Sequence, residues 1–222
     1  MAVALQGSLF NQVETTALAS LSGLRRTRLS HGAWIDLLPG WLTGADALYE
    51  QLAGLATWRA ERRQMYERVV DVPRLLAFYE EGDPLPAPIL DDALAALNAH
   101  YADELGEPFR TAGLCYYRDG HDSVAWHGDT IGRGSVEDTM VAIISVGAPR
   151  PLLLRPRARH GARGPGRPDP DRAQGVIRRA LGHGDLIVMG GSCQRTWEHA
   201  VPKTSKPVGP RISIQFRPRG VR

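Results

Sequence analysis

The chain has few cysteines and no long hydrophobic run, and each scarcity excludes a class of protein. Cys115 and Cys193 are its only cysteines among 222 residues, so it can form neither a disulfide framework nor a cysteine zinc site. No apolar run approaches the roughly 20 residues that span a membrane, and no basic region followed by an apolar stretch opens the chain. We therefore expect a cytoplasmic protein that makes no membrane contact.

Lysine is also scarce, since arginine supplies 25 of the 27 basic side chains. Nine of these arginines fall between residues 150 and 179. Residues 156–175 are rich in Pro and Gly as well, which predicts a mobile basic loop. Such an excess of guanidinium groups is suited to the phosphates of a nucleic acid. The alternative is that a chain using arginine throughout contains such a cluster without a function.

Helix and strand patterns divide the chain into three parts. Residues 1–30 lack clear periodicity and form a partly mobile tail. Residues 31–110 contain predicted helices near 43–55 and 91–105. Residues 111–222 contain short apolar runs separated by Gly, Pro and Asp, which is typical of a sandwich or jelly roll. We expect an α+β protein with eight core strands, near residues 112–117, 123–127, 139–146, 151–155, 175–181, 185–189, 195–200 and 211–217.

Two histidines and one aspartate are the strongest chemical signal. His127 and Asp129 lie two residues apart in an extended segment, so their side chains share a face and can hold one ion. Together with His199 they match the two-imidazole, one-carboxylate ligand set of a non-haem Fe(II) oxygenase, which leaves coordination positions open. Each of these residues taken alone is more often a structural residue than a metal ligand.

The last predicted strand carries an arginine at each end. Its period of two places four polar side chains on one face and three apolar ones on the other. Two guanidinium groups beside a metal site indicate a dianionic cosubstrate, because the guanidinium fork binds carboxylates in pairs of hydrogen bonds. A half-exposed strand with a polar solvent face is the alternative. The polar face consists of Arg211, Ser213, Gln215 and Arg217, and the apolar face of Ile212, Ile214 and Phe216.

Several segments resemble the AlkB-type 2-oxoglutarate/Fe(II)-dependent dioxygenases, the oxidative dealkylases of nucleic acids. The resemblance covers about half the chain and rests on Tyr116–Gly120, Asp122–Asp129, Gly182–Leu186, Trp197–Lys203 and Pro210–Arg217, with a weaker similarity at Val72–Tyr79. It implies a double-stranded β-helix (jelly-roll) core at 111–222 and an N-terminal α/β nucleotide-recognition lid within 31–110. It also implies that the substrate is an N-alkylated base in DNA or RNA.

The resemblance assigns roles to individual residues. His127, Asp129 and His199 would be the catalytic residues and the ligands of Fe(II). Arg211 would bind the distal carboxylate of 2-oxoglutarate, and Arg217 the carboxylate nearer the metal. The remaining contacts to this cosubstrate would come from Tyr117, through its hydroxyl, and from Cys115, Ser213 and Gln215.

Two residues depart from the family pattern. Cys115 stands where the family usually has asparagine, so one polar contact to the cosubstrate should be missing or replaced. Ile131 stands where the family commonly has an acid that meets the exocyclic amino group of the damaged base. Either another acid, such as Glu137 or Asp138, takes over this role, or the range of substrates differs.

Contacts to the substrate are predicted from the lid and the metal site. A base must leave the stack to reach the iron, and aromatic side chains would then enclose it. Tyr79, Trp58 and Trp126 are candidates beside His127, although each is also a candidate core residue. Arg74 is a candidate phosphate contact. The alternative for a lone arginine near a proline is a solvated surface residue.

The segment Gln6-Gly7-Ser8-Leu9-Phe10 resembles the short peptide by which bacterial DNA-repair and replication proteins bind the sliding clamp. Gln6, Leu9 and Phe10 would carry this contact, unless Leu9 and Phe10 pack against the lid instead. We expect a nucleoid-associated monomer in a bacterium, with nucleic acid and the clamp as partners. Two other functions stay open: hydroxylation of a small molecule or protein by the same iron site, and a metal-binding jelly-roll module without activity.

Overall fold

A computed structural model of the chain describes residues 15–65, 68–104, 106–157 and 175–221. Its helices are α1 (Ala45–Leu55), α2 (Pro88–His100) and the short α3 (Cys193–Thr196), with 3-10 turns at Leu21–Gly23, Ser30–Gly32 and Arg133–Ser135. Its strands are β1 (Ala17–Leu18), β2 (Arg25–Arg28), β3 (Ala33–Leu38), β4 (Leu42–Thr43), β5 (Arg59–Met65), β6 (Arg68–Tyr79), β7 (Phe109–Tyr117), β8 (Val124–His127), β9 (Val141–Gly147), β10 (Arg150–Pro156), β11 (Ile177–Leu181), β12 (Asp185–Gly191), β13 (Trp197–Val201) and β14 (Arg211–Pro218).

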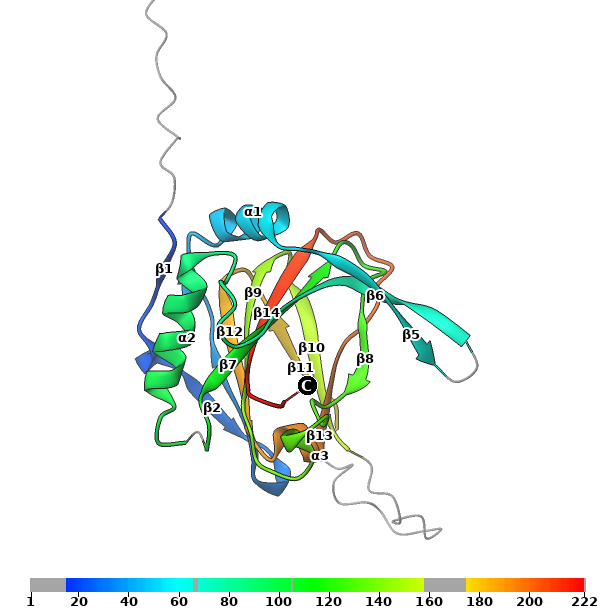
Figure 1. Cartoon of the computed structure of the whole chain (residues 1–222). Coiled ribbons are helices and arrows are strands. Elements are labelled where there is room, and N and C mark those ends of the chain that lie inside the picture. Colours follow the sequence, from blue (N-terminus) through cyan, green and yellow to red (C-terminus); the bar gives the residue numbers. More distant parts are fainter. Residues whose placement is uncertain (1–14, 66–67, 105, 158–174, 222) are drawn as a thin grey trace, which may run out of the picture.

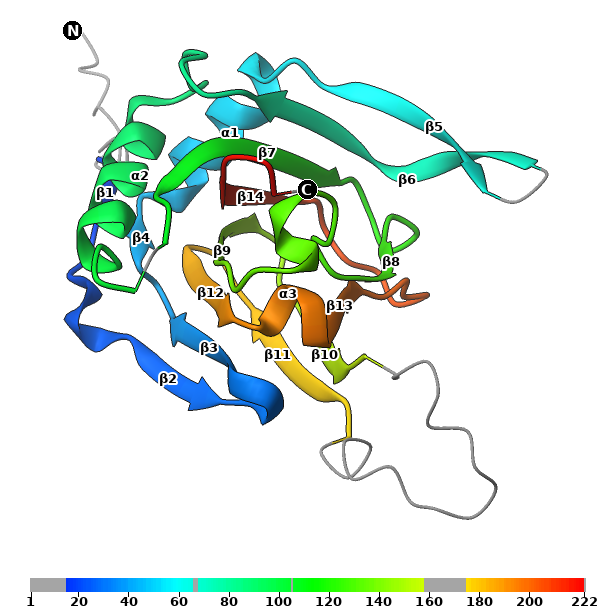
Figure 2. The ribbon, with the colours of Figure 1, turned by 60° about the horizontal axis from the view of Figure 1, so that its bottom comes forward.

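Two antiparallel sheets form the core. The large sheet has the strand order β2-β3-β12-β9-β14-β7-β6-β5, and the small sheet has the order β11-β10-β13-β8. The two sheets lie on opposite sides of the molecule's interior, and α1 and α2 cover the outer face of the large sheet (Figures 1 and 2). This architecture confirms the predicted jelly-roll core, and the eight strands predicted after residue 110 correspond to β7–β14.

The alternation of β14 explains why the large sheet has two differently built faces. Ile212, Ile214 and Phe216 pack against the buried side chains of α1 and α2, among them Leu48 and Leu90. Burial of one such apolar side chain stabilises the fold by roughly 1.5–3 kcal/mol. The intervening polar residues of β14 therefore face the space between the two sheets. A sheet covered on one side and polar on the other thus provides a site within the core.

The hairpin β5–β6 extends the large sheet beyond the core (Figure 2). β6 is 12 residues long and pairs with β7 through Leu75–Tyr79 and with β5 along its other edge. The sequence patterns indicated no strand at β5, whose sequence Arg-Ala-Glu-Arg-Arg-Gln-Met lacks an apolar face. A sheet-edge strand exposed on both faces needs no apolar alternation, and its charges protect the edge from pairing with another chain.

Both large helices begin away from their predicted starts. The first helix was predicted near residues 43–55, but Thr43 pairs with Ala17 as part of β4, and Gly44, with a φ of 63°, precedes α1. α2 begins at Pro88, which fits the first turn because proline there loses no hydrogen bond. No helix in the described part of the chain is long and apolar enough to cross a membrane. The predicted clamp peptide at 6–10 and positions 158–174 of the predicted basic loop lie outside the described residues.

Candidate metal centre

The pairing of β8 with β13 brings the two histidines together. His127 lies directly opposite His199 in this antiparallel pair, and their ring centroids are 4.2 Å apart. Asp129 follows β8 by two residues, and its Oδ1 lies 4.0 Å from Nε2 of His127. One ligand atom from each of the three residues lies within 4.8 Å of the others. This spacing lets the three side chains bind one metal ion.

Gly128 lets the chain turn between the two ligands that flank it. A Cβ atom at this position would lie 2.2 Å from the carbonyl oxygen of Gln194, a distance that no side chain tolerates. The side chain of Gln194 in turn accepts a hydrogen bond from the backbone N–H of Asp129, over 3.0 Å. Glycine therefore permits the contact with α3 that fixes the backbone of the aspartate.

The charge states of the triad suit metal binding. Nδ1 of His127 lies 2.9 Å from the carbonyl oxygen of Ala125, so it carries the proton and leaves Nε2 for a metal. Burial, together with the neighbouring His127, lowers the pKa of His199 to about 3, so this imidazole is neutral at pH 7. Burial alone would raise the pKa of Asp129, but Arg217 and the two histidines lower it to about 2. Neutral imidazoles and an ionised carboxylate are the forms that bind cations.

The two arginines of β14 have different surroundings. Nε of Arg217 donates to Oδ2 of Asp129 over 3.0 Å, and its terminal nitrogen donates to the side-chain oxygen of Gln215. Arg211 is only 1% exposed, and its Nε donates to the hydroxyl of Ser145 over 2.7 Å. One terminal nitrogen of Arg211 is buried without a hydrogen-bond partner among the described residues. A buried cation that lacks a carboxylate is costly, so this position calls for an anion.

A cavity of about 720 Å³ joins these groups, a volume within the ordinary range for a small-molecule site. The triad, Arg211, Arg217 and Tyr117 all line it, together with Ser213 and Gln215 of β14 and Cys115 of β7. Ile131 also lines it and is 69% exposed. The strand face predicted to be polar thus borders one cavity shared by the metal centre and both guanidinium groups.

A family model described as the 2OG-Fe(II) oxygenase superfamily matches residues 37–217. The chain belongs to this superfamily. Its members use Fe(II) and 2-oxoglutarate, so the chain is a 2-oxoglutarate-dependent dioxygenase. The residues present fit both groups: the triad supplies the donor types that Fe(II) takes, and the buried Arg211 lacks the anion that a cosubstrate carboxylate would provide.

Individual relatives narrow the assignment to the AlkB type. The chain is 29% identical over 207 residues to the alpha-ketoglutarate-dependent dioxygenase alkB homolog 3 of Bos taurus, covering 84% of this chain and 68% of the relative. It is 26% identical over 188 residues to the DNA oxidative demethylase ALKBH2 of Homo sapiens, covering 78% and 68%. These relatives support an AlkB-type oxidative demethylase.

Solved structures show the same fold at low sequence identity. The structure of OsALKBH1 superposes with a TM-score of 0.54 at 14% identity, covering 88% of this dioxygenase and all of that chain. The carbocyclase SnoK from nogalamycin biosynthesis superposes with a TM-score of 0.55 at 14% identity, covering 83% and 79%.

The predicted aromatic contacts need correction, because none of the three candidates lines the cavity. Trp126 adjoins His127 in β8 and so points to the opposite face, where the guanidinium of Arg155 covers its ring at 4.2 Å. Tyr79 packs against the core beneath the helices, and Trp58 contacts the ring of Tyr116 there. Besides Tyr117, the aromatic ring of Phe78 lines the cavity, and Phe78 is 43% exposed. Side chains two residues apart in a strand share a face, so Phe78 lies on the same face of β6 as Arg74. This alternation could have identified Phe78 from the sequence.

Arg74 and Cys115 both line the cavity. Arg74 lines the cavity instead of projecting to the surface, and one of its terminal nitrogens donates to the carbonyl of Ser123 over 3.0 Å. Its Nε is buried without a partner in the described structure. At Cys115, where a polar contact was expected to be replaced, the amide nitrogen of Gln215 lies 3.6 Å from the sulfur and 3.4 Å from the hydroxyl of Ser213. An amide group from β14 therefore lies where that contact would be.

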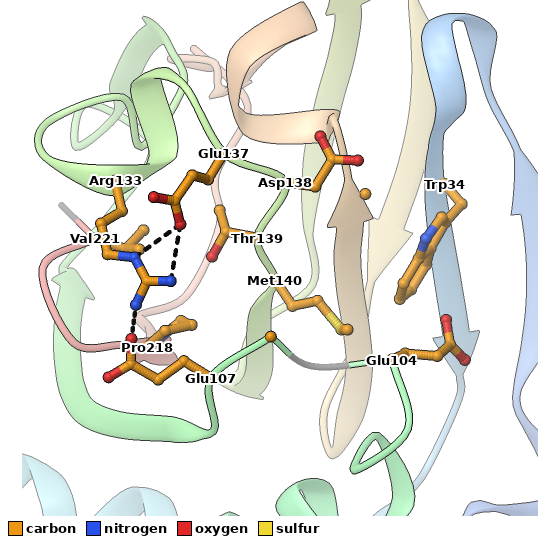
Figure 3. A pocket seen from close by; sticks show the side chains of 12 residues that line it. Trp34, Glu104, Glu107, Arg133, Glu137, Asp138, Thr139, Met140, Pro218 and Val221 are labelled. Atoms are coloured by element: carbon orange, nitrogen blue, oxygen red, sulfur yellow. Dashed lines mark hydrogen bonds and ion pairs between the residues drawn. The ribbon is translucent and has the colours of Figure 1, made fainter.

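The two acids suggested as substitutes at Ile131 face elsewhere. Glu137 and Asp138 line a separate pocket near Trp34 (Figure 3). There Arg133 forms ion pairs with Glu137 and Glu107 (Figure 3), and Asp138 pairs with Arg195. These contacts hold the segment that follows Asp129. They do not place either acid at the cavity of about 720 Å³.

Proposed function

We propose that this AlkB-type dioxygenase removes alkyl groups from the ring nitrogens of bases in DNA and thereby repairs them. The observation that carries the proposal is the single cavity onto which the triad, both β14 arginines and an aromatic side chain converge. The relatives, a DNA oxidative demethylase among them, support DNA as the substrate. RNA bases carry the same alkylated nitrogens and are the natural comparison.

In this proposal each polar group of the cavity has one task. His127, Asp129 and His199 would hold Fe(II), Arg211 would bind the distal carboxylate of 2-oxoglutarate, and Arg217 the carboxylate nearer the metal. Hydrogen-bonding surface for the cosubstrate would come from Tyr117, Cys115, Ser213 and Gln215. When bound, Fe(II) with 2-oxoglutarate and dioxygen supplies the oxidation that hydroxylates the alkyl carbon, with release of succinate and carbon dioxide. The hydroxyalkyl base then loses an aldehyde.

The protein itself positions the reactants and excludes water. Arg217 holds Asp129 through Oδ2, which leaves Oδ1 directed toward His127. The base must be flipped out of a duplex or taken from a single strand to reach this depth. Phe78 and Ile131 then offer apolar surface to its ring. Small-molecule sites are usually lined by hydrophobic side chains, with a few polar groups that orient the ligand.

The proposal is tested by mass spectrometry of oligonucleotides that each carry one methylated base, incubated with Fe(II), 2-oxoglutarate and air. The wild type should remove the methyl group and release equal amounts of succinate and formaldehyde. Asp129→Ala should remove none, because it loses the ligand carboxylate. The matched control is Asp92→Ala on the exposed face of α2, which should behave as the wild type.

The same assay separates the alternatives. Ile131, an isoleucine at the cavity where the family commonly has an acid, is the observation that favours hydroxylation of a small molecule or protein. That activity would turn over 2-oxoglutarate with such compounds and leave every methylated oligonucleotide unchanged. A protein that binds Fe(II) but yields no succinate with any of these substrates would instead be a metal-binding module.

We also propose that residues 6–10 dock this dioxygenase onto the sliding clamp, on the strength of Gln6, Leu9 and Phe10. A chain lacking residues 1–10 should no longer bind the clamp, while its turnover of free oligonucleotides should equal that of the full chain. Lost turnover would show that Leu9 and Phe10 support the enzyme's own structure. The expectations of a monomer and of a cytoplasmic, nucleoid-associated location belong to the same proposal.

A further inference from the structure

The side chains that line the cavity leave it with an excess of positive charge. Among the described lining residues, the cations are Arg74, Arg211 and Arg217. The acids among them are Asp129 and Glu61. The two imidazoles of the triad are neutral in the form that binds a metal, and the charges of Fe(II) and of the two 2-oxoglutarate carboxylates cancel each other. With both groups bound, the cavity therefore still contains one positive charge more than it has negative charges.

Both acids of the cavity already have cationic partners. Oδ2 of Asp129 accepts a hydrogen bond from Arg217 over 3.0 Å, and Asp129 also belongs to the triad. Burial would lower the pKa of Arg74, but neighbouring groups, Glu61 among them, raise it, so Glu61 and Arg74 attract each other. Neither carboxylate can thus balance a cationic substrate without weakening an attraction that the protein already has. A substrate with a positive ring would remain unpaired beside excess positive charge.

Hydrogen-bond donors, in contrast, are available in the cavity. Thr130 directly follows Asp129 and lines the cavity, and its hydroxyl makes no hydrogen bond with any described residue. Nε of Arg74 is buried without a partner among the described residues. Beside them Ile131, which is 69% exposed, adds apolar surface. These groups suit a ligand that presents carbonyl oxygens, because a carbonyl accepts hydrogen bonds and carries no positive charge.

Alkylated bases differ in the groups that flank the alkylated ring nitrogen. In thymine and uracil, N3 lies between two carbonyl groups, and the alkylated base is neutral. In adenine alkylated at N1 and in cytosine alkylated at N3, an amino group lies beside the nitrogen, and the ring is cationic. A site discriminates between such ligands when the wrong one leaves polar groups of the site unpaired. The charge and the donors of this cavity therefore match the neutral class, in which carbonyl groups flank the nitrogen.

We propose that this dioxygenase selects neutral bases that are alkylated between two carbonyl groups, such as N3-alkylated thymine or uracil. Thr130 donates a hydrogen bond to a carbonyl of the base, and Ile131 provides apolar contact without a charge that would attract a cationic ring. This selection rests on the proposed function, since it takes an alkylated base as the substrate. Thr130 and Ile131 are then the specificity residues of the cavity, separate from the groups that would hold the metal and the cosubstrate.

The test compares oligonucleotides that carry one 3-methyluracil or one 3-methylcytosine. Both bases are methylated at N3 of the same ring, but the first has a carbonyl at position 4 and is neutral, whereas the second has an amino group there and is cationic. With 2-oxoglutarate present and Mn(II) in place of Fe(II) to prevent turnover, fluorescence anisotropy should show roughly ten-fold tighter binding of 3-methyluracil by the wild type. Thr130→Val, which keeps the shape and removes the hydroxyl, should lose roughly ten-fold in affinity for 3-methyluracil and about two-fold or less for 3-methylcytosine.

Ile131→Glu should reverse the preference, because its carboxylate would balance a cationic ring. The matched control is Val136→Glu, which adds the same charge at a side chain that is 76% exposed and lies outside the cavity, and it should bind both bases as the wild type does. A wild type that binds 3-methylcytosine as tightly as 3-methyluracil, an unchanged preference in Ile131→Glu or Thr130→Val, or an equal reversal in Val136→Glu would each overturn the selection while leaving the demethylase intact. A wild type that consumes 2-oxoglutarate with other compounds but demethylates no oligonucleotide would overturn the proposed function, and with it this selection.

Discussion

The buried Arg211 gives the sharpest prediction, because removing it should strengthen the cosubstrate-free protein and abolish cosubstrate binding. This guanidinium is 1% exposed, donates to Ser145, and has no carboxylate partner among the described residues. Desolvation lowers its pKa below the ordinary arginine value, which is the sign expected for a cation that the fold destabilises. Arg211→Met keeps much of the side-chain volume and removes the charge.

The magnitude follows from two opposing changes in the free energy of unfolding. Replacement of buried ionic groups by apolar ones is neutral or stabilising by about 1–4 kcal/mol, whereas the lost hydrogen bond to Ser145 costs about 1 kcal/mol. The cosubstrate-free variant should therefore be as stable as the wild type or about 1–3 kcal/mol more stable. In the wild type, 2-oxoglutarate at 100 times its Kd should add about 2.7 kcal/mol, which raises Tm by roughly 5–10 °C.

Thermal unfolding with and without 2-oxoglutarate, with Mn(II) in place of Fe(II) to prevent turnover, measures both effects. Arg211→Met should show no increase in Tm on addition of 2-oxoglutarate. Arg25→Met on the exposed strand β2 is the control for a generic arginine replacement and should respond as the wild type does. A variant that loses more than about 3 kcal/mol without cosubstrate, or that is stabilised by 2-oxoglutarate as strongly as the wild type, would refute the reasoning.

Two further predictions concern the second arginine of β14 and the loop before β8. In Gly113→Ala the new Cβ would lie 2.9 Å from a terminal nitrogen of Arg217 and would displace this guanidinium. Steady-state kinetics should show a roughly ten-fold rise in the KM for 2-oxoglutarate, and thermal unfolding should show little change in Tm. Burial alone would raise the pKa of Asp122, but hydrogen bonds from Arg118 lower it. This carboxylate therefore stabilises the fold above its unfolded pKa of about 3.9, and the stabilisation is lost as pH falls through the folded pKa. Urea unfolding of Asp122→Asn should show a loss of about 1 kcal/mol at pH 7, discounted because Arg118 is half exposed, and a progressively smaller loss as pH falls below the unfolded pKa.

Sequence alone predicted those parts of the fold in which apolar residues recur at one regular spacing along a whole helix or strand. In β14 the strict alternation of polar and apolar residues identified both the strand and the face that lines the cavity. Turn residues between short apolar runs identified β7–β14, which are eight of the twelve strands that the two core sheets have in the described part of the chain. The spacing of His127 and Asp129 indicated one shared face, and the structure places both beside His199.

The hairpin that forms one wall of the cavity could not be predicted in the same way. β5 is charged on both faces because it lies at an exposed edge, so it carries no apolar period. β5 and β6 pair with a register shift between Ala60 and Arg62, and such a shift depends on pairing between strands, which no local pattern records. Tyr79 was a predicted contact and Phe78 was not, although the alternation from Arg74 places Phe78 on the cavity face. Predicting the residues of this cavity wall therefore required the tertiary structure, whereas the spacing of His127 and Asp129 was visible in the sequence.

The location of His127 at the edge of the small sheet predicts that metal binding changes the local stability of β8. β8 is four residues long and lies at the border of the small sheet, where β13 is its one neighbouring strand. A border strand with so few ladder bonds is among the first parts of a sheet to fray. An ion shared between His127 and His199 would fasten β8 to β13 at the point where their residues face each other. Metal binding would thus act as a crosslink between β8 and β13 and stabilise this edge of the small sheet. Without metal, the enzyme would be most susceptible to proteolysis at β8.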